Sequence, residues 1–347
     1  MRRNNFIDFL RGGAIFLMLW GHCIQYSSPD NVDFFLNGCY KFIYSFHMPL
    51  FMCISGYLFR RSIMRNSKNI KNRIVGIAQP LIIGNIVNYY IAQIFTCPDD
   101  KIKLSNFVAG SWLNGMKELW YLWALLMATI CVFISVKVVK NKFVQLGLMM
   151  LLGILNLLVP NVNACLFVYP YFILGFIVND IIDSIFEHAN IVMGCTGIIF
   201  FVMLTKYQKK HYIYTTGFYS SEYSLWENIG VDLFRYSIGF FGCIFVVLLM
   251  KKIWKYCKNL RIVNAVAKLG EKSLQVYVMS CSLLSILLPK VFDNIFQFYG
   301  SDLMWVRNTF VFNFITTFSL AIIYAVGLFK LAAFLEKYDI GKIIFGR

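Results

Sequence analysis

Long runs of apolar residues recur along this chain, and they limit the folds it can adopt more than any other feature. A run of about 17–25 apolar residues is long enough to cross the hydrocarbon core of a bilayer as a helix. Because lipid offers no partners to backbone N–H and C=O groups, such a run crosses as an α-helix with internal hydrogen bonds. We therefore expect an all-α integral membrane protein, a bundle of about ten transmembrane helices. The runs lie near 7–27, 39–59, 74–96, 117–137, 143–159, 164–180, 189–206, 229–250, 272–289 and 308–333.

The composition agrees with this fold class. Only 14% of the 347 residues are charged and 59% are hydrophobic, whereas a soluble domain has about 25% charged residues. No low-complexity linker separates a soluble part from the apolar runs. We therefore expect residues 1–347 to form a single transmembrane domain with no appended soluble domain.

The positive charge of the chain indicates its orientation in the membrane. The formal net charge is +16, but the lysines and arginines lie in short loops beside apolar runs, as topology signals do. With both termini in the cytoplasm, 21 of these residues fall on the inner side and nine on the outer side. We therefore expect cytoplasmic N- and C-termini and no nucleic-acid partner.

The ten cysteines are scattered and no pair has CxxC spacing. Most lie inside apolar runs, which is typical of small buried side chains. We expect neither a metal site nor a disulfide framework.

One apolar run, residues 6–25 (FIDFLRGGAIFLMLWGHCIQ), carries polar residues along its whole length. At 100° per residue, Arg11 and His22 lie about 20° apart around a helix axis and roughly 16 Å apart along it. Asp8 and Gln25 each fall about 40° from one of these two residues. A charged side chain at membrane depth is costly and normally faces protein or water at a functional site. This run therefore predicts a polar stripe that lines a buried site.

The second run contains His47, shortly before Pro49, and the small residues Ser55 and Gly56. A proline inside a helix frees a backbone carbonyl and bends the helix, and small residues allow a neighbouring helix to approach closely. A lone membrane histidine is more often a packing residue than a catalyst, so both roles stay open for His47.

Further candidates lie toward the outer side. Glu118 and Trp120 open the fourth run, where an aromatic belt explains the ring and the carboxylate is placed to face an outer vestibule. Asp232 and Arg235 are three residues apart and can pair on one helix face, either to satisfy each other or to serve a ligand. The outer loop 206–228 is rich in tyrosine, which suits sugar faces and lipid headgroups alike.

The loop between the second and third runs (RRSIMRNSKNIKNR) holds six positive charges and no acid. It is consistent with a topology signal in contact with anionic membrane lipid. It is also consistent with a cytoplasmic site for phosphate groups, but the loop by itself favours the topology signal.

Several stretches of the chain resemble acyltransferase family 3, the bacterial membrane acyltransferases that O-acylate surface polysaccharides and related acceptors. IDFLRGGAIFLMLWGH matches the Arg-x10-His motif of the first helix, with Arg11 and His22. FHMPLFMCISGYLFRR matches the pattern of the second helix. KNRIVGIAQP, LWYLWALL and LGEKSLQVY resemble later motifs, the last of which contains Tyr277.

The resemblance implies a multi-pass enzyme of the bacterial inner (cytoplasmic) membrane. Its donor would be acyl-CoA, such as acetyl-CoA, as co-substrate, and its acceptor a glycan or lipid-linked glycan, with no bound cofactor. The family often has Arg-x-x-Arg entering the third helix and a histidine after the ninth-helix tyrosine, where this chain has Gly76 and Ser280. Contacts to the donor therefore fall to four basic residues, namely Arg60, Arg61, Lys71 and Arg73.

For the chemistry, we expect His22 to be the general base, because a histidine takes up a proton near neutral pH. A neighbour such as Glu118 or His47 would hold it. Arg11 would bind the donor or stabilise developing negative charge. The supporting or acceptor-binding residues are expected among Asp8, His47, Ser55, Glu118, Trp120, Arg235 and Tyr277.

Two other classes of function compete with this interpretation. A secondary transporter uses intramembrane Asp, Arg and His residues for substrate or protons, but the two halves of this chain show no convincing inverted repeat. A membrane-embedded interaction protein would explain Asp232 and Arg235 as packing residues, but it leaves the polar stripe unexplained.

Overall fold

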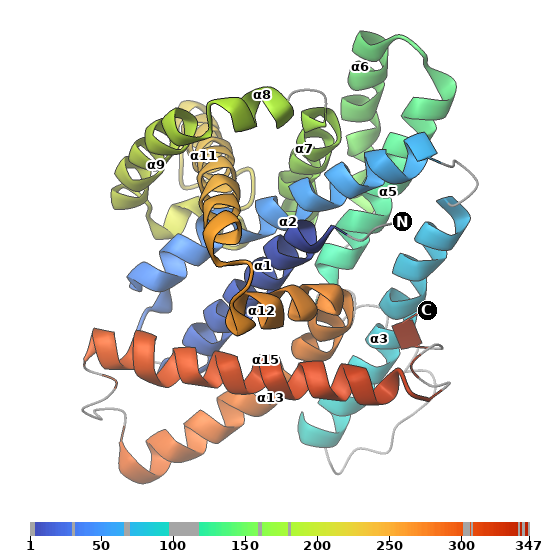
Figure 1. Ribbon diagram of the computed structural model, residues 1–347. Helices are drawn as coiled ribbons and strands as arrows, with labels where there is room; N and C mark the ends of the chain where they lie inside the picture. The colour runs from blue at the N-terminus through green and yellow to red at the C-terminus, as the bar shows by residue number, and fades with distance from the viewer. Residues whose placement is uncertain are drawn as a thin grey trace.

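The computed structural model describes residues 4–338 apart from 30–31, 66–69, 97–117, 159–161, 180–181, 301–305 and 307, together with residues 341, 344 and 345. Within these ranges the chain is helical and contains no strand (Figure 1). The loop 97–116 and the two extreme ends, which carry some of the charges used to orient the chain, lie outside the described residues.

Each of the ten apolar runs coincides with a helical segment. The segments are α1 (Asn5–Tyr26), α2 (Gly38–Arg65), α3 (Ile70–Thr96), α5 (Trp120–Val138), α6 (Lys142–Leu152) continued by η3 (Gly153–Leu158), α7 (Val162–Val178), α9 (Ala189–Thr205), α11 (Leu225–Cys257), α13 (Ser273–Tyr299), and the π-helix η5 (Val311–Thr317) running into α15 (Phe318–Leu335).

The all-α membrane class is confirmed by these helices. Six of the described helices are long and apolar enough to cross a membrane, or seven if the bent helix α13 is counted as one span. Three shorter apolar helices lie at 142–157, 162–178 and 189–205. The figure of ten complete crossings and the cytoplasmic placement of both termini stay predictions.

The first helix occupies the centre of the bundle. α1 contacts α2, α11, α13 and α15 (Figure 1). About two thirds (67%) of the most apolar 18-residue stretch of α1 is buried, whereas only 22% is buried in the peripheral helix formed by η5 and α15. The polar stripe of α1 is therefore enclosed by protein.

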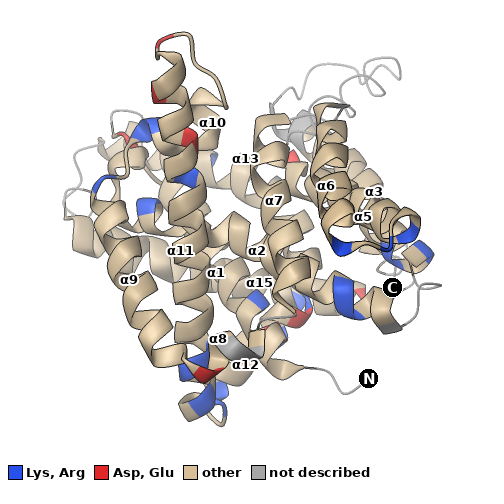
Figure 2. Cartoon of the chain, turned by 90° about the horizontal axis from the view of Figure 1, so that it is seen from above, with Lys and Arg blue, Asp and Glu red and all other residues tan. Residues whose placement is uncertain are grey.

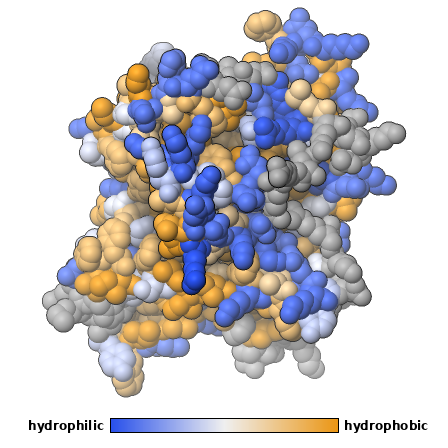
Figure 3. All heavy atoms as spheres, viewed as in Figure 1, coloured by the Kyte–Doolittle hydropathy of each residue, from blue (hydrophilic) through white to orange (hydrophobic). Residues whose placement is uncertain are grey.

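A short helix that the apolar runs do not reveal packs across α1. This helix, α12 (Arg261–Glu271), buries Val263, Ala267, Leu269 and Gly270 on one side and exposes charged residues on the other. It is amphipathic and only 11 residues long, so a search for membrane-spanning runs passes over it. In Figure 3 hydrophilic residues run over the middle of the face where α12 lies in the matching view of Figure 1.

Glycines let α12 and α1 touch backbone to backbone. A Cβ on Gly12 would clash with the carbonyl of Val266, and a Cβ on Gly270 would clash with the carbonyl of Asp8. The same device joins α2 to α7, where a Cβ on Gly56 would meet the carbonyl of Phe172. The expected close approach at Gly56 is therefore confirmed.

The C-terminal half of α1 is held by a side-chain contact to the π-helix. The indole Nε1 of Trp20 donates to the carbonyl of Asn313 at 3.2 Å and to Oγ1 of Thr317 at 3.1 Å. A π-helix leaves backbone carbonyls offset from the regular i to i+4 pattern, and such turns recur at sites of special contact. α1 is thus fixed at both ends, by α12 and by η5.

We expect Gly12→Ala to destabilise the bundle by about 1–3 kcal/mol, as overpacking in a well-packed core does. The added methyl group would force α12 away from α1. Thermal unfolding of the purified protein in detergent measures this effect. Gly147→Ala on α6 is the matched control, because a Cβ there meets no atom within 4 Å and alanine stabilises a helix interior relative to glycine. Equal melting temperatures for the two variants would contradict this account of the α1–α12 contact.

Candidate active site

Two cavities lie along the polar stripe of α1. The larger, which we call the His22 chamber, has a volume of about 240 Å³. The smaller, the Arg11 chamber, has a volume of about 60 Å³. Met18, Met48 and Tyr277 border both cavities, so these three side chains form the partition between them.

The His22 chamber is lined by rings and polar groups from six segments of the chain. α1 supplies His22, Gln25 and Tyr26, and α2 supplies Tyr40, Tyr44 and His47. The remaining polar or aromatic lining residues are Phe35, Glu118, Trp120, Tyr214, Tyr277, Ser280, Cys281 and Ser285. The structure thus brings together five of the residues predicted from the sequence, namely His22, His47, Glu118, Trp120 and Tyr277.

His22 contacts Tyr44, a residue that the sequence analysis does not single out. The hydroxyl of Tyr44 lies 3.3 Å from Nδ1 of His22 and 3.3 Å from Oε1 of Gln25. A tyrosine hydroxyl has one proton to donate. If that proton points to the amide oxygen of Gln25, Nδ1–H of His22 donates to the Tyr44 oxygen. Nε2 of His22 is then left with a lone pair for a bound hydroxyl.

We expected Glu118 or His47 to hold His22, whereas the residue in contact with Nδ1 of His22 is Tyr44. His47 also contacts Tyr44, with its ring 4.6 Å from the Tyr44 ring. Its Nδ1 donates to the carbonyl of Ile43 at 2.9 Å, because a carbonyl can only accept. His47 is 2% exposed, so it combines a packing contact with a place in the chamber wall.

The carbonyl of Glu118 joins two elements at the chamber wall. It accepts from the hydroxyl of Tyr277 at 3.3 Å and from Sγ of Cys281 at 3.5 Å. These bonds tie α13 to the start of α5. The Glu118 side chain itself is exposed and borders the chamber. Trp120 packs edge-to-face against Tyr214 at 5.8 Å.

The Arg11 chamber is built around the Arg11 guanidinium. Its Nη2 donates to Oγ of Ser273 at 2.7 Å, and its Nη1 lies 3.9 Å from Oδ1 of Asp8. Asp8 is 6% exposed. The α12–α13 corner therefore supplies a hydrogen-bond partner, and α1 itself supplies the countercharge.

Arg73 is the one of the four expected donor-binding residues that reaches this part of the bundle. Its Nη2 donates to the carbonyl of Ser55 at 3.2 Å, and the Ser55 hydroxyl lies 3.2 Å from that of Tyr121. Ser55 and Tyr121 line the Arg11 chamber. The charges of Arg11 and Arg73 act on each other, so two cations serve this region.

The other three expected donor-binding residues are Arg60, Arg61 and Lys71, and their side chains have other surroundings. Arg60 donates to the carbonyl of Phe176 at 3.1 Å, and its guanidinium lies over the Phe176 ring. Arg61 lies over the ring of Tyr57. Lys71 is exposed. These three side chains do not line either chamber, and Arg73 lies beside the Arg11 chamber without lining it.

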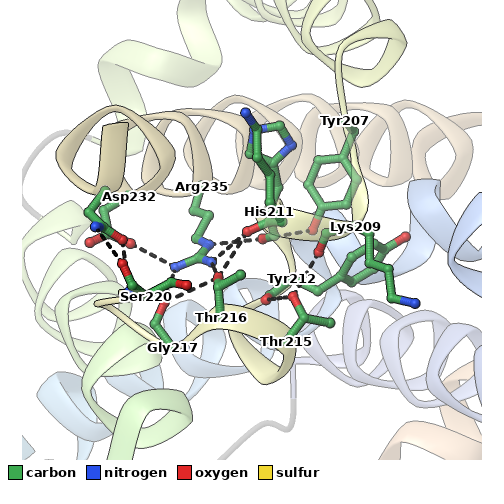
Figure 4. Close-up of polar contacts among 12 residues, drawn as sticks. Tyr207, Lys209, His211, Tyr212, Thr215, Thr216, Gly217, Ser220, Asp232 and Arg235 are labelled. Atoms are coloured by element: carbon green, nitrogen blue, oxygen red, sulfur yellow. Dashed lines mark hydrogen bonds and ion pairs between the residues drawn. The ribbon is translucent and has the colours of Figure 1, made fainter. Parts of the chain in front are cut away.

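Arg235 has a different environment from Arg11. It is 2% exposed, and its five N–H groups make five hydrogen bonds (Figure 4). Nε donates to the carbonyl of His211 at 3.0 Å, and Nη1 to the carbonyl of Gly217 at 2.6 Å and to Oδ1 of Asp232 at 2.7 Å. Nη2 donates to the carbonyl of Lys210 at 2.7 Å and to Oγ1 of Thr216. Arg235 therefore organises the outer segment rather than either chamber.

That outer segment consists of η4 (Lys209–His211), α10 (Ile213–Thr216) and the turn at Gly217. Figure 2 places α10 at the opposite end of the molecule from α8 and α12. Tyr214 of α10 borders the His22 chamber. By binding the carbonyls on both sides of α10, Arg235 fixes the position of Tyr214 in the chamber wall.

His211 is held neutral in the same segment. Its Nδ1 accepts from the backbone N–H of Gln208 at 2.8 Å. Burial lowers the pKa of His211 to about 4, and the charges of Lys210 and Arg235 act in the same direction. Since Nδ1 must stay unprotonated to accept this bond, the surroundings and the hydrogen bond favour the same charge state.

Several contacts that build the two chambers could not be assigned from the sequence. Tyr44 precedes His47 by three residues and so shares its helix face, which is the only local signal for it. Ser273 and Tyr121 lie in the LGEKSLQVY and LWYLWALL stretches, but nothing local pairs either of them with Arg11 or Ser55. Among the described residues, no three His, Cys, Asp or Glu side chains group in a way that could hold a metal ion.

We expect Arg235→Lys to loosen the outer segment, because a lysine ammonium has three donors and cannot reproduce the fork of a guanidinium. A lysine keeps the charge opposite Asp232 but leaves at least two of the five acceptors without a donor, and each buried acceptor left unsatisfied costs about 1–3 kcal/mol. The expected result is cleavage within residues 206–217 at least about tenfold faster under limited proteolysis. Arg261→Lys on the exposed face of α12 is the control, and it should leave the digestion pattern unchanged. An unchanged pattern for Arg235→Lys as well would show that Arg235 does not hold this segment.

Comparison with known proteins assigns the family. The family model described as an acyltransferase domain, that of acyltransferase family 3, matches residues 4–329. Over 213 residues the chain is 30% identical to nodulation protein NolL of Sinorhizobium fredii, and this match covers 56% of the chain and 53% of that protein. Over 292 residues it is 25% identical to nodulation protein NolL of Mesorhizobium japonicum, with 78% and 74% covered.

The chain thus spans about half the length of the first of these relatives. No solved structure matches it. The family match runs from the start of α1 into α15 and so includes both chambers, together with the Arg-x10-His spacing on which they are built. The chain belongs to acyltransferase family 3, a family of membrane acyltransferases.

Proposed function

We propose that this chain moves an acetyl or similar short acyl group from acyl-CoA to a hydroxyl of a cell-surface polysaccharide, oligosaccharide or lipid-linked glycan. It would do so in the bacterial inner membrane, with His22 as general base and Arg11 in donor binding. One observation supports the proposal most strongly. A single helix face presents a histidine to one cavity and an arginine to the next, and three side chains border both cavities.

Acyl transfer to a hydroxyl needs a base at the attacking oxygen. As that oxygen bonds to the thioester carbonyl carbon, its proton passes to Nε2 of His22. The C–S bond then breaks, and the departing thiolate takes the proton from His22, which returns to its neutral form. The contact of Nδ1 with the Tyr44 hydroxyl, which in turn can donate to Gln25, favours the tautomer in which Nε2 can accept this proton.

A positive charge is needed where the donor binds. A guanidinium binds phosphate or carbonyl oxygens through a planar fork of donors. Arg11 borders the smaller chamber, and Arg73 lies close by. The volume of about 60 Å³ compares with the roughly 150 Å³ of a cavity that binds benzene. A space of this size suits a small acyl group and not a long chain.

The chemistry of the larger chamber suits a sugar acceptor. Tyrosine and tryptophan rings offer an apolar face with a polar edge, and this combination packs against sugar rings. Tyr26, Tyr40, Tyr44, Trp120 and Tyr214 supply such faces. The relatives are named for nodulation.

A secondary transporter is the rival function, since it would use the same intramembrane residues. Membership of the acyltransferase family favours the enzyme. Purified protein incubated with acetyl-CoA and a panel of cell-envelope glycans should release free CoA. Substrate-dependent proton flux without CoA release from any glycan would favour the transporter.

We expect His22→Ala to lower the rate of acyl transfer by at least about 10²-fold, because a general base contributes roughly 10²–10⁴-fold. The readout is CoA release per enzyme at saturating acetyl-CoA. His188→Ala is the matched control, because His188 is exposed and borders neither chamber. A wild-type rate for His22→Ala would rule out the assignment of the base.

We expect Arg11→Ala to weaken CoA binding by about 10- to 100-fold, because a hydrogen bond to a charged group contributes about 1.5–3 kcal/mol. Acceptor binding should change far less, since Arg11 does not border the His22 chamber. Titration of the protein with CoA and with acceptor separates the two effects, and Arg261→Ala serves as the control. Equal losses for both ligands would contradict the division of labour between the chambers.

A further inference from the structure

An apolar groove lies away from both chambers, at the end of the bundle where α1 begins. It has a volume of about 120 Å³, and no polar surface lines it. Its walls come from α1, α2, α7, α8 (Ile182–Glu187) and α11. Ile185 and Phe186 of α8 and Ile244 and Val247 of α11 are among its lining residues. Phe240 at its edge is 37% exposed, so the groove reaches the surface of the protein.

A basic cavity continues this groove. It has a volume of about 410 Å³ and is lined by α8, the start of α9 and the last turns of α11. Three lysines border it, Lys251, Lys252 and Lys255, against a single carboxylate, Glu187. In Figure 2 the ribbon has several blue positions (Lys or Arg) and a red one (Asp or Glu) at this end, beside α8 and α12.

The two spaces meet at shared residues. Phe186 and Leu248 line both the groove and the basic cavity. The ammonium of Lys251 lies over the Phe186 ring, at the junction. An apolar slot thus opens directly into a pocket with excess positive charge.

We propose that this composite site binds an anionic phospholipid, with the first few carbons of one acyl chain in the groove and the phosphate headgroup among the three lysines. An apolar slot that opens into a basic pocket matches the arrangement of such a lipid, in which an apolar acyl chain leads to an anionic headgroup. Basic pockets between membrane helices on the cytoplasmic side bind anionic headgroups, and the orientation expected from the loop charges puts this end on that side. A zwitterionic headgroup would bring an ammonium group into the same basic pocket and would bind less well.

The site is independent of acyl transfer. None of its lining residues borders the His22 chamber, and Ile54 is the one residue that it shares with the Arg11 chamber. The lipid would fill the space between α8 and the helices of the bundle. Its binding can be measured without any acceptor or acyl-CoA.

Native mass spectrometry of the full-length protein, titrated with phosphatidylglycerol and with phosphatidylcholine of the same chains, tests the proposal. We expect roughly tenfold tighter binding of phosphatidylglycerol, because each lysine near a headgroup adds to the attraction. This preference should decrease with added salt. A phosphatidylglycerol with a photoactivatable acyl chain should crosslink to peptides of α8 and α11 in the unmodified protein.

Two variants separate the parts of the site. Replacing Lys251, Lys252 and Lys255 together with glutamine should remove the preference for the anionic lipid. The same change at Lys137, Lys140 and Lys142, which removes an equal charge elsewhere, should leave the preference intact. Val247→Trp fills the groove and should weaken binding of both lipids. Equal affinity for the two lipids in the unmodified protein, an equal effect of the two lysine triples, or crosslinks confined to other helices would each overturn the proposal.

Discussion

The guanidinium of Arg11, buried inside a bundle of apolar helices, is the constraint on which the rest of the structure depends. A charge at this depth needs partners, because the cost of burying it alone is high. Asp8 supplies the countercharge from the same helix, but Ser273 has to come from the far end of the chain. The corner between α12 and α13 must therefore press against α1, and Gly12 and Gly270 make that approach possible. The arrangement that satisfies one charge thus also positions α13, which carries Tyr277 into the partition.

Arg11 and Arg235 show how the same residue type can have two different roles in one bundle. Arg235 makes five hydrogen bonds to loop carbonyls, a hydroxyl and Asp232, and so has no donor left for a ligand. Arg11 borders a cavity and is 23% exposed in its side chain. A guanidinium whose N–H groups all donate to the protein has a structural role, whereas one that borders a cavity is placed to bind a ligand. The sequence alone could not make this distinction, because both residues lie in apolar runs with an aspartate three positions away.

The sequence predicts features that lie within one helix better than contacts between separate helices. The helical segments were predicted well because the apolar character of 17–25 consecutive residues is a local property. The stripe with Arg11 and His22 was found for the same reason, since both residues lie on one helix. Ser273, Tyr121 and the approach of Arg73 to Ser55 depend on how separate helices pack, and one sequence carries no direct record of that. α12 escaped notice because it is short and amphipathic, and Tyr44 because a tyrosine in an aromatic-rich helix has no distinctive spacing.

The partition formed by Met18, Met48 and Tyr277 bears on whether protons can leak through the bundle. Cavities open to water from both ends of a bundle would let protons leak and dissipate the ion gradient that a cytoplasmic membrane maintains. Two flexible thioether side chains and one tyrosine ring interrupt such a path, because methionine fills irregular gaps and adapts to what passes. In the proposed reaction a small acyl group would displace these side chains for a moment, whereas a continuous file of water would need them to stay apart. The same three residues that separate the two chambers would therefore also keep the bilayer electrically tight.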